Sequence, residues 1–242
     1  MQENQVHEGG KTKVSGEVRK FLTNFYTHLR PNHRTFFSTA FSRASKVTYD
    51  FVNFNYTKTL RWSAPSRGAT TYKENFGSIL HVHGEVNNAP LLGVDNENQI
   101  ANPEFRKLMN IRRSLLKPQL SQEMQTGKME RAMSLIKKAN IIVCFGLSLG
   151  ESDHSWWKQI GTWLTQTQNS VFVIFWYPEE HISPLFPEDE LSIEDDVLND
   201  FARLAKISSD EYEAIKSEKL FARVHDGIFK EKAINEDEIP AV

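Results

Sequence analysis

The chain has 242 residues, of which 39% are hydrophobic and 25% charged, a composition typical of an ordinary globular protein. Its formal net charge of −2 gives no general electrostatic reason to expect nucleic acid or an anionic membrane as a partner. No apolar stretch approaches the roughly 20 residues of a membrane helix, and residues 1–10 carry no signal-peptide core, so we expect a cytoplasmic protein without membrane contact. The single cysteine, Cys144, rules out an internal disulfide and a zinc site built on several thiolates, and a buried reduced thiol is its simplest interpretation.

Taken in chain order, the sequence predicts a disordered tail over residues 1–16, a helical annex over 17–45, an α/β domain over 46–230 and a solvated tail over 231–242. Within the annex, Pro31 separates two helices. Strands are predicted over residues 47–55, 78–83, 90–94, 141–145, 170–176 and 222–230. Helices are predicted over residues 105–116, 121–138, 195–205 and 210–221, and from about residue 152 onward. Strands that alternate with helices favour a Rossmann-like domain with a mainly parallel sheet.

The most informative stretch is the apolar run Ile141–Phe145, which is followed by Gly146-Leu-Ser148-Leu-Gly150 and then by a helix. The run shows no alternation, which predicts a strand covered on both faces, as in a parallel sheet. Gly146 and Gly150 bracket a tight turn, and Ser152 or Asp153 is expected to cap the helix. In α/β folds ligands bind at such strand–turn–helix edges, because free backbone N–H groups point out of them.

Polar residues follow two further predicted strands. Asn55 ends the strand over residues 47–55, and His83-Gly84 ends the strand over residues 78–83. Because parallel strands end at one edge of the sheet, we expect Asn55, His83 and Ser148 to line one crevice. Such a set suits attack on an electrophilic sugar carbon, in which Asn holds a water or a ribose hydroxyl, His removes a proton and backbone amides hold phosphate.

Each of these residues also has a plainer interpretation. Asn55 fits a strand-end turn, and His83 fits a structural histidine. His81 and His83 share one face of a strand but lack a third ligand nearby, so we expect no metal site. Asp153 fits a helix N-terminal charge that favours the dipole. Three tryptophans of the following helix fit the core: Trp156, Trp157 and Trp163.

The turn Gly146-Leu-Ser148-Leu-Gly150 also satisfies G-x-S-x-G, the pattern of a serine hydrolase nucleophile elbow. Asp195 or Asp196, and then His225, follow in the right order for a catalytic triad. Against this interpretation, acidic residues follow the supposed nucleophile where hydrolase elbows continue with small apolar residues. The serine hydrolase is therefore retained as an alternative.

Four segments together resemble the bacteriophage abortive infection AbiH family, which in turn looks like a distant branch of the sirtuin-like NAD-binding fold. They are residues 54–60 (FNYTKTL), 81–84 (HVHG), 91–95 (LLGVD) and 145–153 (FGLSLGESD). The resemblance covers about residues 47–177. It implies a phage-defence protein of bacteria, NAD as cofactor or substrate, and a phage-derived trigger.

The resemblance also implies roles for single residues. His83 corresponds to the catalytic histidine and Asn55 to the asparagine of the nicotinamide-ribose pocket, while Gly84, Gly146, Ser148 and Asp153 correspond to the cofactor-binding side. The chain departs from the family pattern at Arg61, where the family has glutamate, and at Leu147, where it has histidine.

A further departure lies upstream, since no strand with a G-x-G loop precedes Asn55. We therefore expect either a shortened form or a chain whose first strand is encoded upstream or supplied by another chain. An NAD glycohydrolase and a non-catalytic binding module of the same fold remain alternatives, and the sequence does not define an oligomeric state.

Overall fold

The computed structural model describes residues 18–57, 60, 74–86, 90–123, 127–178, 182 and 187–225, and the side chains of residues 121–123 lie outside the description. The tails expected over residues 1–16 and 231–242 fall outside these ranges, as does Arg61. No helix among the described residues is long and apolar enough to cross a membrane.

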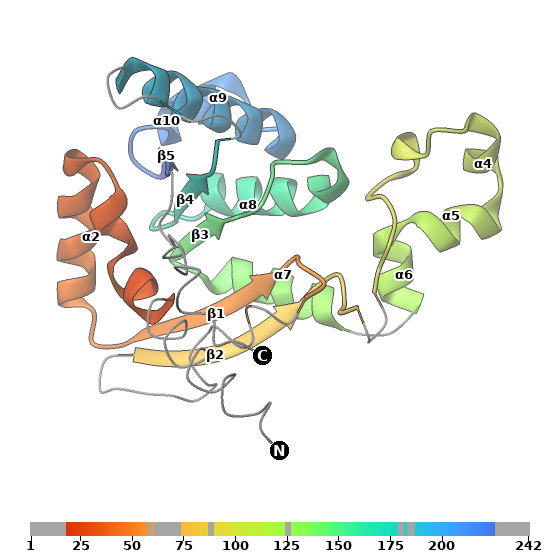
Figure 1. Cartoon of the computed structure of the whole chain (residues 1–242), viewed down its shortest axis with the longest axis horizontal. Coiled ribbons are helices and arrows are strands. Elements are labelled where there is room, and N and C mark those ends of the chain that lie inside the picture. The colour runs from red at the N-terminus through yellow and green to blue at the C-terminus, as the bar shows by residue number, and fades with distance from the viewer. Residues whose placement is uncertain are drawn as a thin grey trace, which may run out of the picture.

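The described strands form two parallel sheets, one with the order β1-β2 and one with the order β3-β4-β5 (Figure 1). Their bounds are β1 Val47–Asn53, β2 Glu74–His81, β3 Ile141–Phe145, β4 Val171–Trp176 and β5 Leu220–Val224. The α/β class, with small parallel sheets flanked by helices, is thus confirmed. The prediction of a strand over residues 90–94 is wrong, because this segment contributes only an isolated bridge between Val94 and Leu116.

Residues 18–24 are helical and run into a short 3-10 helix, η1. The helices that begin and end within the described residues are η1 Phe25–His28, α2 Pro31–Arg43, η2 Glu97–Gln99, α4 Pro103–Lys107, α5 Met109–Leu115, α6 Lys117–Glu123, α7 Lys128–Lys138, η3 Glu151–Asp153, α8 His154–Gln166, α9 Pro187–Ala205 and α10 Ser209–Ile215. Pro31 separates the first two helices as expected, because proline fits the first turn of α2.

Several predicted helix bounds need correction. The helix predicted over residues 105–116 is divided at Leu108, which is extended, and the one over 121–138 is replaced by α6 and α7, with Gly127 at φ 56° before α7. The helix predicted over 210–221 ends at Ile215, and Leu220 and Phe221 instead begin β5. Pairing with β4 buries both of these side chains, and this burial outweighs their helical spacing.

The three-stranded sheet is covered on both faces, as the continuous apolar run of β3 predicted. Alternate side chains of β4 point to opposite faces. Val171, Val173 and Phe175 pack with the N-terminal helices, and Phe172 and Ile174 pack in the larger cluster with α7, α8 and α9. The tryptophans of α8 lie in this second cluster, as predicted.

Cys144 on β3 is a free, buried thiol, as expected, and burial raises its pKa to about 12. Such a thiol stays protonated and unreactive at neutral pH.

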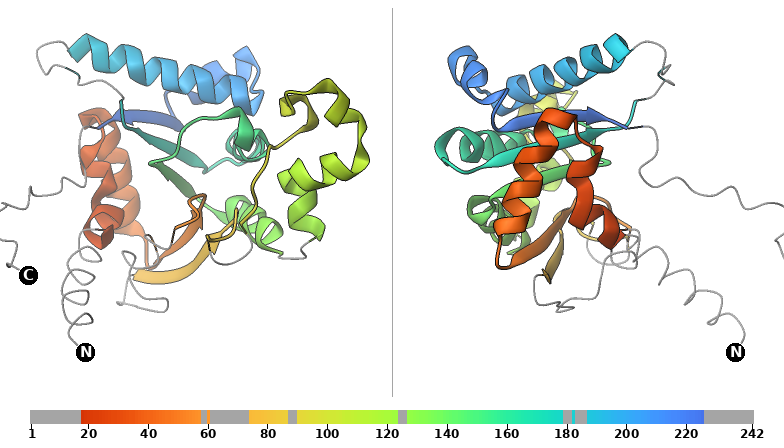
Figure 2. Two further views of the ribbon diagram at one scale, coloured as in Figure 1. Left: turned by 45° about the vertical axis from the view of Figure 1, so that its right-hand side comes forward. Right: turned by 90° about the vertical axis from the view of Figure 1, so that its left-hand side faces the viewer.

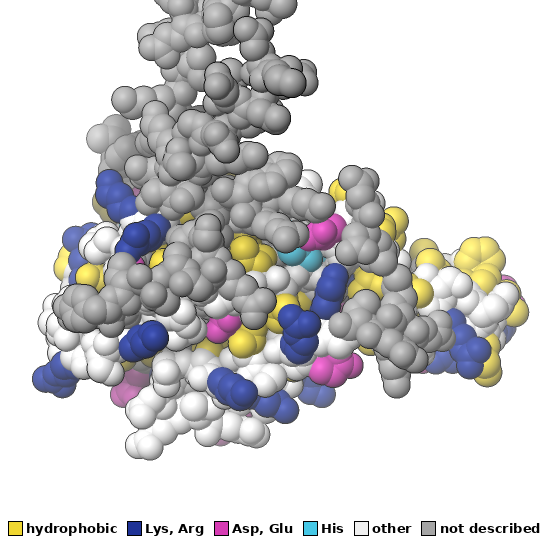
Figure 3. All heavy atoms as spheres, turned by 90° about the horizontal axis from the view of Figure 1, so that it is seen from below, with side chains coloured by type: hydrophobic (Ala, Val, Ile, Leu, Met, Phe, Trp, Pro, Cys, Tyr) yellow, Lys and Arg dark blue, Asp and Glu magenta, His cyan; other side chains and the backbone are white. Residues whose placement is uncertain are grey.

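Helices α4, α5 and α6 form an arm that projects from the body of the molecule (Figure 2). Hydrophobic and basic side chains are visible on the arm in Figure 3, and Phe105, Leu108 and Met109 are exposed. The first residue of α6, Lys117, turns back from this arm toward the ends of β2 and β3, where the candidate site lies.

Candidate functional site

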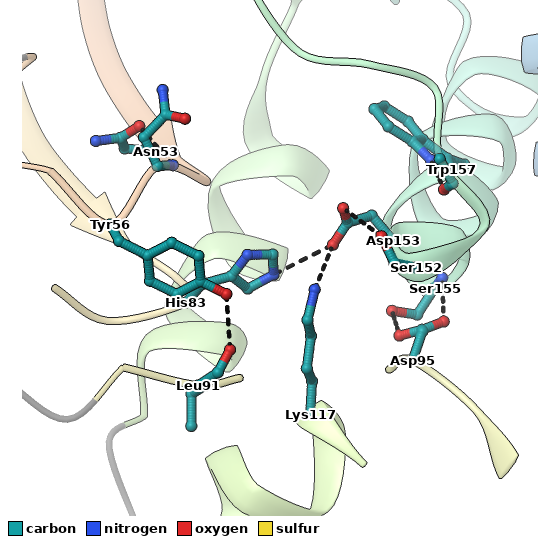
Figure 4. Close-up of polar contacts among 12 residues, drawn as sticks. Asn53, Tyr56, His83, Leu91, Asp95, Lys117, Ser152, Asp153, Ser155 and Trp157 are labelled. Atoms are coloured by element: carbon teal, nitrogen blue, oxygen red, sulfur yellow. Dashed lines mark hydrogen bonds and ion pairs between the residues drawn. The ribbon is translucent and has the colours of Figure 1, made fainter. Parts of the chain in front are cut away.

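His83 lies two residues beyond the end of β2, in a turn that its own neighbours hold in place. Gly84 adopts φ 78° and donates its N–H to His81 O, and Leu91 N donates to His83 O at 2.7 Å. His83 is 6% exposed, and the ring of Phe54 meets its imidazole edge-on, with the ring centroids 5.2 Å apart. Tyr56, whose hydroxyl donates to Leu91 O, lies beside it (Figure 4). The rings of Phe54 and Tyr56 and the hydrogen bonds of the turn therefore fix the position of the His83 ring.

The open side of the His83 ring faces a carboxylate. Nε2 of His83 lies 3.2 Å from Oδ1 of Asp153, which is also 3.4 Å from Nζ of Lys117 (Figure 4). The ring N–H is not aligned for a hydrogen bond, so Nε2 is a buried polar atom without a hydrogen-bond partner among the described residues. We treat the contact as electrostatic. It favours the proton on Nε2, which leaves Nδ1 as the ring's acceptor.

Asp153 was expected to cap the helix that follows, and it occupies the N-cap of α8 but makes no side-chain capping bond. The side chain that accepts hydrogen bonds from the first turn of α8 belongs to a different residue. Asp95, from the loop before η2, accepts Ser155 N at 2.8 Å and Ser155 Oγ at 2.7 Å. Because Asp95 satisfies the start of α8, the carboxylate of Asp153 is left to face His83 and Lys117.

Burial raises the pKa of Asp153, but the interactions with His83 and the positive charge of Lys117 outweigh burial and hold the pKa below its usual value. Burial and the negative charge of Asp153 in turn raise the pKa of Tyr56, so this hydroxyl remains a donor at neutral pH. The site thus combines an ionised carboxylate with an imidazole, an ammonium group and a phenol.

The depressed pKa of Asp153 makes stability depend on pH. A carboxylate whose pKa is lower in the folded state stabilises the fold above its unfolded pKa, about 3.9, and loses that contribution as pH falls through the folded value. We therefore expect Asp153→Asn to lower Tm most near neutral pH, with the gap to wild type narrowing below about pH 4. Thermal melts of both proteins across this range measure it, and a gap that is independent of pH would contradict the assignment.

The predicted residue Asn55 is exposed, and its neighbour Asn53 takes the buried position. Nδ2 of Asn53 lies 3.2 Å from Nδ1 of His81, and Oδ1 of Asn53 accepts Asn55 N at 3.1 Å. His81 therefore ties the ends of β1 and β2 together, which accounts for its burial. Among the described residues, the side chain of Asn55 makes no hydrogen bond to His83 or Asp153.

The loop after β3 begins with Gly146 at φ 62°, a conformation that favours glycine. Ser148 is exposed, and its backbone oxygen accepts Gly150 N at 3.0 Å. Gly150 O accepts the indole N–H of Trp157, which fixes the far end of the loop to α8. The loop thus leads directly into Asp153, while Gly146 and Ser148 lie at its outer part.

The geometry of Ser148 argues against a hydrolase elbow. In such an elbow the serine sits on a strained strand-to-helix turn, whereas Lys206 is the only non-glycine residue with positive φ in the described part of the chain. The supposed triad histidine, His225, stacks on Phe145 with ring centroids 5.0 Å apart, and Asp195 and Asp196 are exposed on α9.

A small pocket opens beside His83. Its lining is Val82, His83, Leu91, Asp95, Lys117, Pro118, Met129 and Trp156. The pocket is far smaller than a typical small-molecule site, so a nucleotide would enter it only if the surrounding side chains move. The described residues contain no cluster of three or more His, Cys, Asp or Glu side chains that could hold a metal ion.

Sequence reasoning identified His83 and Asp153 but missed Lys117 as a partner in the site. Lys117 follows no strand and carries no motif, so nothing in its local sequence indicates that α6 delivers it to Asp153. Asp95 belongs to the segment 91–95, but its bond to α8 depends on the path of the loop.

A family model described as "Bacteriophage abortive infection AbiH" matches residues 2–176 of the chain. No curated protein and no solved structure matches the chain.

Proposed function

The chain belongs to the bacteriophage abortive infection AbiH family, and from this premise we propose a phage-defence protein that binds NAD at the His83 pocket and cleaves it between nicotinamide and ribose. The observation that carries the proposal is the buried contact between Nε2 of His83 and Oδ1 of Asp153, which lie 3.2 Å apart. A carboxylate in this position favours the tautomer that leaves Nδ1 as the acceptor, as a general base requires.

In the proposed reaction a water oxygen bonds to the ribose carbon as the carbon–nitrogen bond breaks. The electron pair of that bond stays with nicotinamide, and Nδ1 of His83 takes the proton of the water as general base. Asp153 holds the ring in the required tautomer and stabilises the imidazolium. Asn55 positions the ribose or the water, and Gly84, Gly146 and Ser148 hold the cofactor. Lys117 offers a positive charge for its phosphates.

The proposed sirtuin-like arrangement rests on strand ends. Asn55, His83 and the loop from Gly146 each follow the carboxyl end of a parallel strand, where α/β folds bind nucleotides. Gly146, at φ 62°, and Ser148 are exposed in this loop, and we propose that its backbone N–H groups bind the phosphate.

The sequence contains no G-x-G loop before Asn55, and in this fold such loops bind the pyrophosphate. Losing several dipole contacts together costs about 3–4 kcal/mol, roughly a hundred- to a thousandfold in affinity. We therefore expect the purified chain to bind NAD weakly and to hydrolyse it slowly. A nicotinamide-release assay tests this expectation, and rapid hydrolysis by these 242 residues would show that the loop is dispensable.

Ser148→Ala separates cofactor binding from hydrolase chemistry. If the hydroxyl donates one hydrogen bond to the cofactor, its loss costs about 0.5–1.5 kcal/mol and weakens NAD binding modestly. Nicotinamide release should then persist, and a fluorophosphonate probe should leave the wild type unlabelled. Covalent labelling that disappears in Ser148→Ala would instead identify a serine hydrolase.

A further inference from the structure

Asp153 lies between two residues that one short segment holds in place. The segment is residues 95–99, which lead into and include η2. Its last residue, Gln99, donates a side-chain N–H to the backbone oxygen of Glu151, two residues before Asp153. Because Glu151 begins η3 and Asp153 ends it, this bond fixes the start of the turn that carries the site carboxylate.

The first residue of the same segment holds the chain on the other side of Asp153. Asp95 accepts hydrogen bonds from Ser155 N at 2.8 Å and Ser155 Oγ at 2.7 Å, and Ser155 lies two residues after Asp153 (Figure 4). The backbone on both sides of Asp153 is therefore tied to one segment. We call the bonds of Gln99 to Glu151 and of Asp95 to Ser155 the brace.

The contacts of Gln99 fix the orientation of its amide. Its Oε1 accepts the backbone N–H groups of Asp95 at 2.8 Å and Asn96 at 3.2 Å, and its Nε2 meets a backbone oxygen, which can only accept. A flipped amide would place its NH2 group against two N–H donors, so the network allows one orientation. One side chain thus holds the segment together and ties it to the turn before α8.

The chain just before this segment is anchored to the arm. Val94 N donates to Leu115 O at 2.8 Å, and Lys117 N donates to Val94 O at 2.9 Å. Gly93 permits this close approach, since a Cβ there would lie 2.1 Å from Leu115 O. One stretch of chain therefore fixes the backbone of Lys117 and the backbone around Asp153.

These contacts give a role to a side chain that does not line the pocket. We infer that Gln99 is a positioning residue, which holds the carboxylate of Asp153 against Nε2 of His83 through the brace. The same brace keeps this carboxylate 3.4 Å from Nζ of Lys117. The inference rests on the proposed function only for the reaction assigned to the pair, because the geometry of the pair can be measured without NAD.

NMR of the full chain tests this role through the tautomer of His83. A ¹H–¹⁵N correlation of the imidazole distinguishes a proton on Nε2 from one on Nδ1, at a pH where the ring is neutral. In wild type the proton should lie mainly on Nε2, which faces Asp153 at 3.2 Å. In Gln99→Ala the ratio of the Nε2–H to the Nδ1–H tautomer should fall at least about threefold, because electrostatic attraction weakens with distance and with the entry of water.

The titration of Asp153 gives a second measure of the same geometry. His83 and Lys117 hold the pKa of this carboxyl below its usual value, so loss of the brace should raise the pKa toward that value. Carboxyl ¹³C shifts followed against pH measure it. The titratable groups around Asp153 are His83, Lys117 and Tyr56, and Gln99→Ala changes the charge of none of them.

Two further variants sharpen the test. Asn102→Ala is the matched control, because Asn102 also uses its side-chain oxygen to cap a helix, α4, but lies outside the brace. It should leave the tautomer ratio and the pKa of Asp153 unchanged. Ser155→Ala removes one of the two bonds to Asp95, so it should move both quantities in the same direction as Gln99→Ala, by a smaller amount.

Three results would overturn the inference. The first is an unchanged tautomer ratio and an unchanged pKa of Asp153 in a folded Gln99→Ala variant. The second is an equal change in Asn102→Ala, which would reflect a general loosening of the segment. If Gln99→Ala does not fold, the third is the absence of both shifts in Ser155→Ala. The expected shifts in a protein that does not cleave NAD would support the brace and refute only the proposed reaction.

Discussion

His83→Ala should lower the rate of nicotinamide release from NAD by about 10²–10⁴-fold relative to wild type, the usual contribution of a general base. The imidazole is buried beside Asp153, which favours the tautomer whose Nδ1 takes the proton from water. The measurement is a nicotinamide assay at millimolar NAD, with long incubation because the wild-type rate is expected to be low.

His28→Ala is the matched control for His83→Ala. His28 is exposed in η1, where it contacts Phe175 of β4 and Arg223 of β5 and none of the residues around His83. The bond that it accepts from Arg223 uses its backbone oxygen, which alanine keeps. This variant should retain the wild-type rate. If His83→Ala folds normally and releases nicotinamide as fast as wild type, His83 is not the base.

The largest expected effect on stability belongs to Glu194→Ala. Glu194 on α9 is 6% exposed, and its carboxylate accepts Arg30 Nε at 2.8 Å, Arg223 Nη1 at 2.8 Å and Val224 N at 3.2 Å. Removing the carboxylate leaves the partly buried guanidinium of Arg30 and the Val224 N–H without this partner, while Arg223 keeps Glu190, so we expect a loss of about 1–3 kcal/mol. Arg30 precedes α2 and Arg223 lies on β5, so the variant should loosen three elements at once.

Urea unfolding of Glu194→Ala and of Asp196→Ala measures this effect. Asp196 lies two residues away on α9 but is exposed, so its substitution should change the free energy of unfolding by less than about 0.5 kcal/mol. Equal, small losses in both variants would show that the buried network contributes little to stability.

The sequence predicted those parts of the fold in which local pattern and burial agree. The run Ile141–Phe145 became β3 with the expected bounds, and β4 lacks only the first residue of its predicted range. Prediction failed where tertiary pairing decides the structure, as at Leu220 and Phe221, which lie in β5 although their spacing suited a helix. The sequence did not predict that the strands divide into two sheets, because the sequence of one strand does not specify which strand pairs with it.

The candidate site was predictable to a similar extent. The rule that ligands bind at the ends of parallel strands selected His83 and Asp153, which the structure places 3.2 Å apart. It also selected Asn55, whereas the buried amide belongs to Asn53, because β1 ends at Asn53 and Asn55 lies exposed in the loop beyond it. Lys117 could not be found, since its position depends on how the arm of α4 to α6 folds back.

The most direct test of the account is an NMR titration of the chain with NAD, which follows the side-chain signals of His83 and the backbone amides of residues 146–150. Binding does not require turnover, and titration to a high NAD concentration allows for the weak affinity that is expected without a glycine loop. The account predicts saturable shifts of these signals at up to about 10 mM NAD, with the affinity weakened in Ser148→Ala. Unchanged His83 signals at that concentration, or shifts confined to residues remote from the pocket, would contradict it.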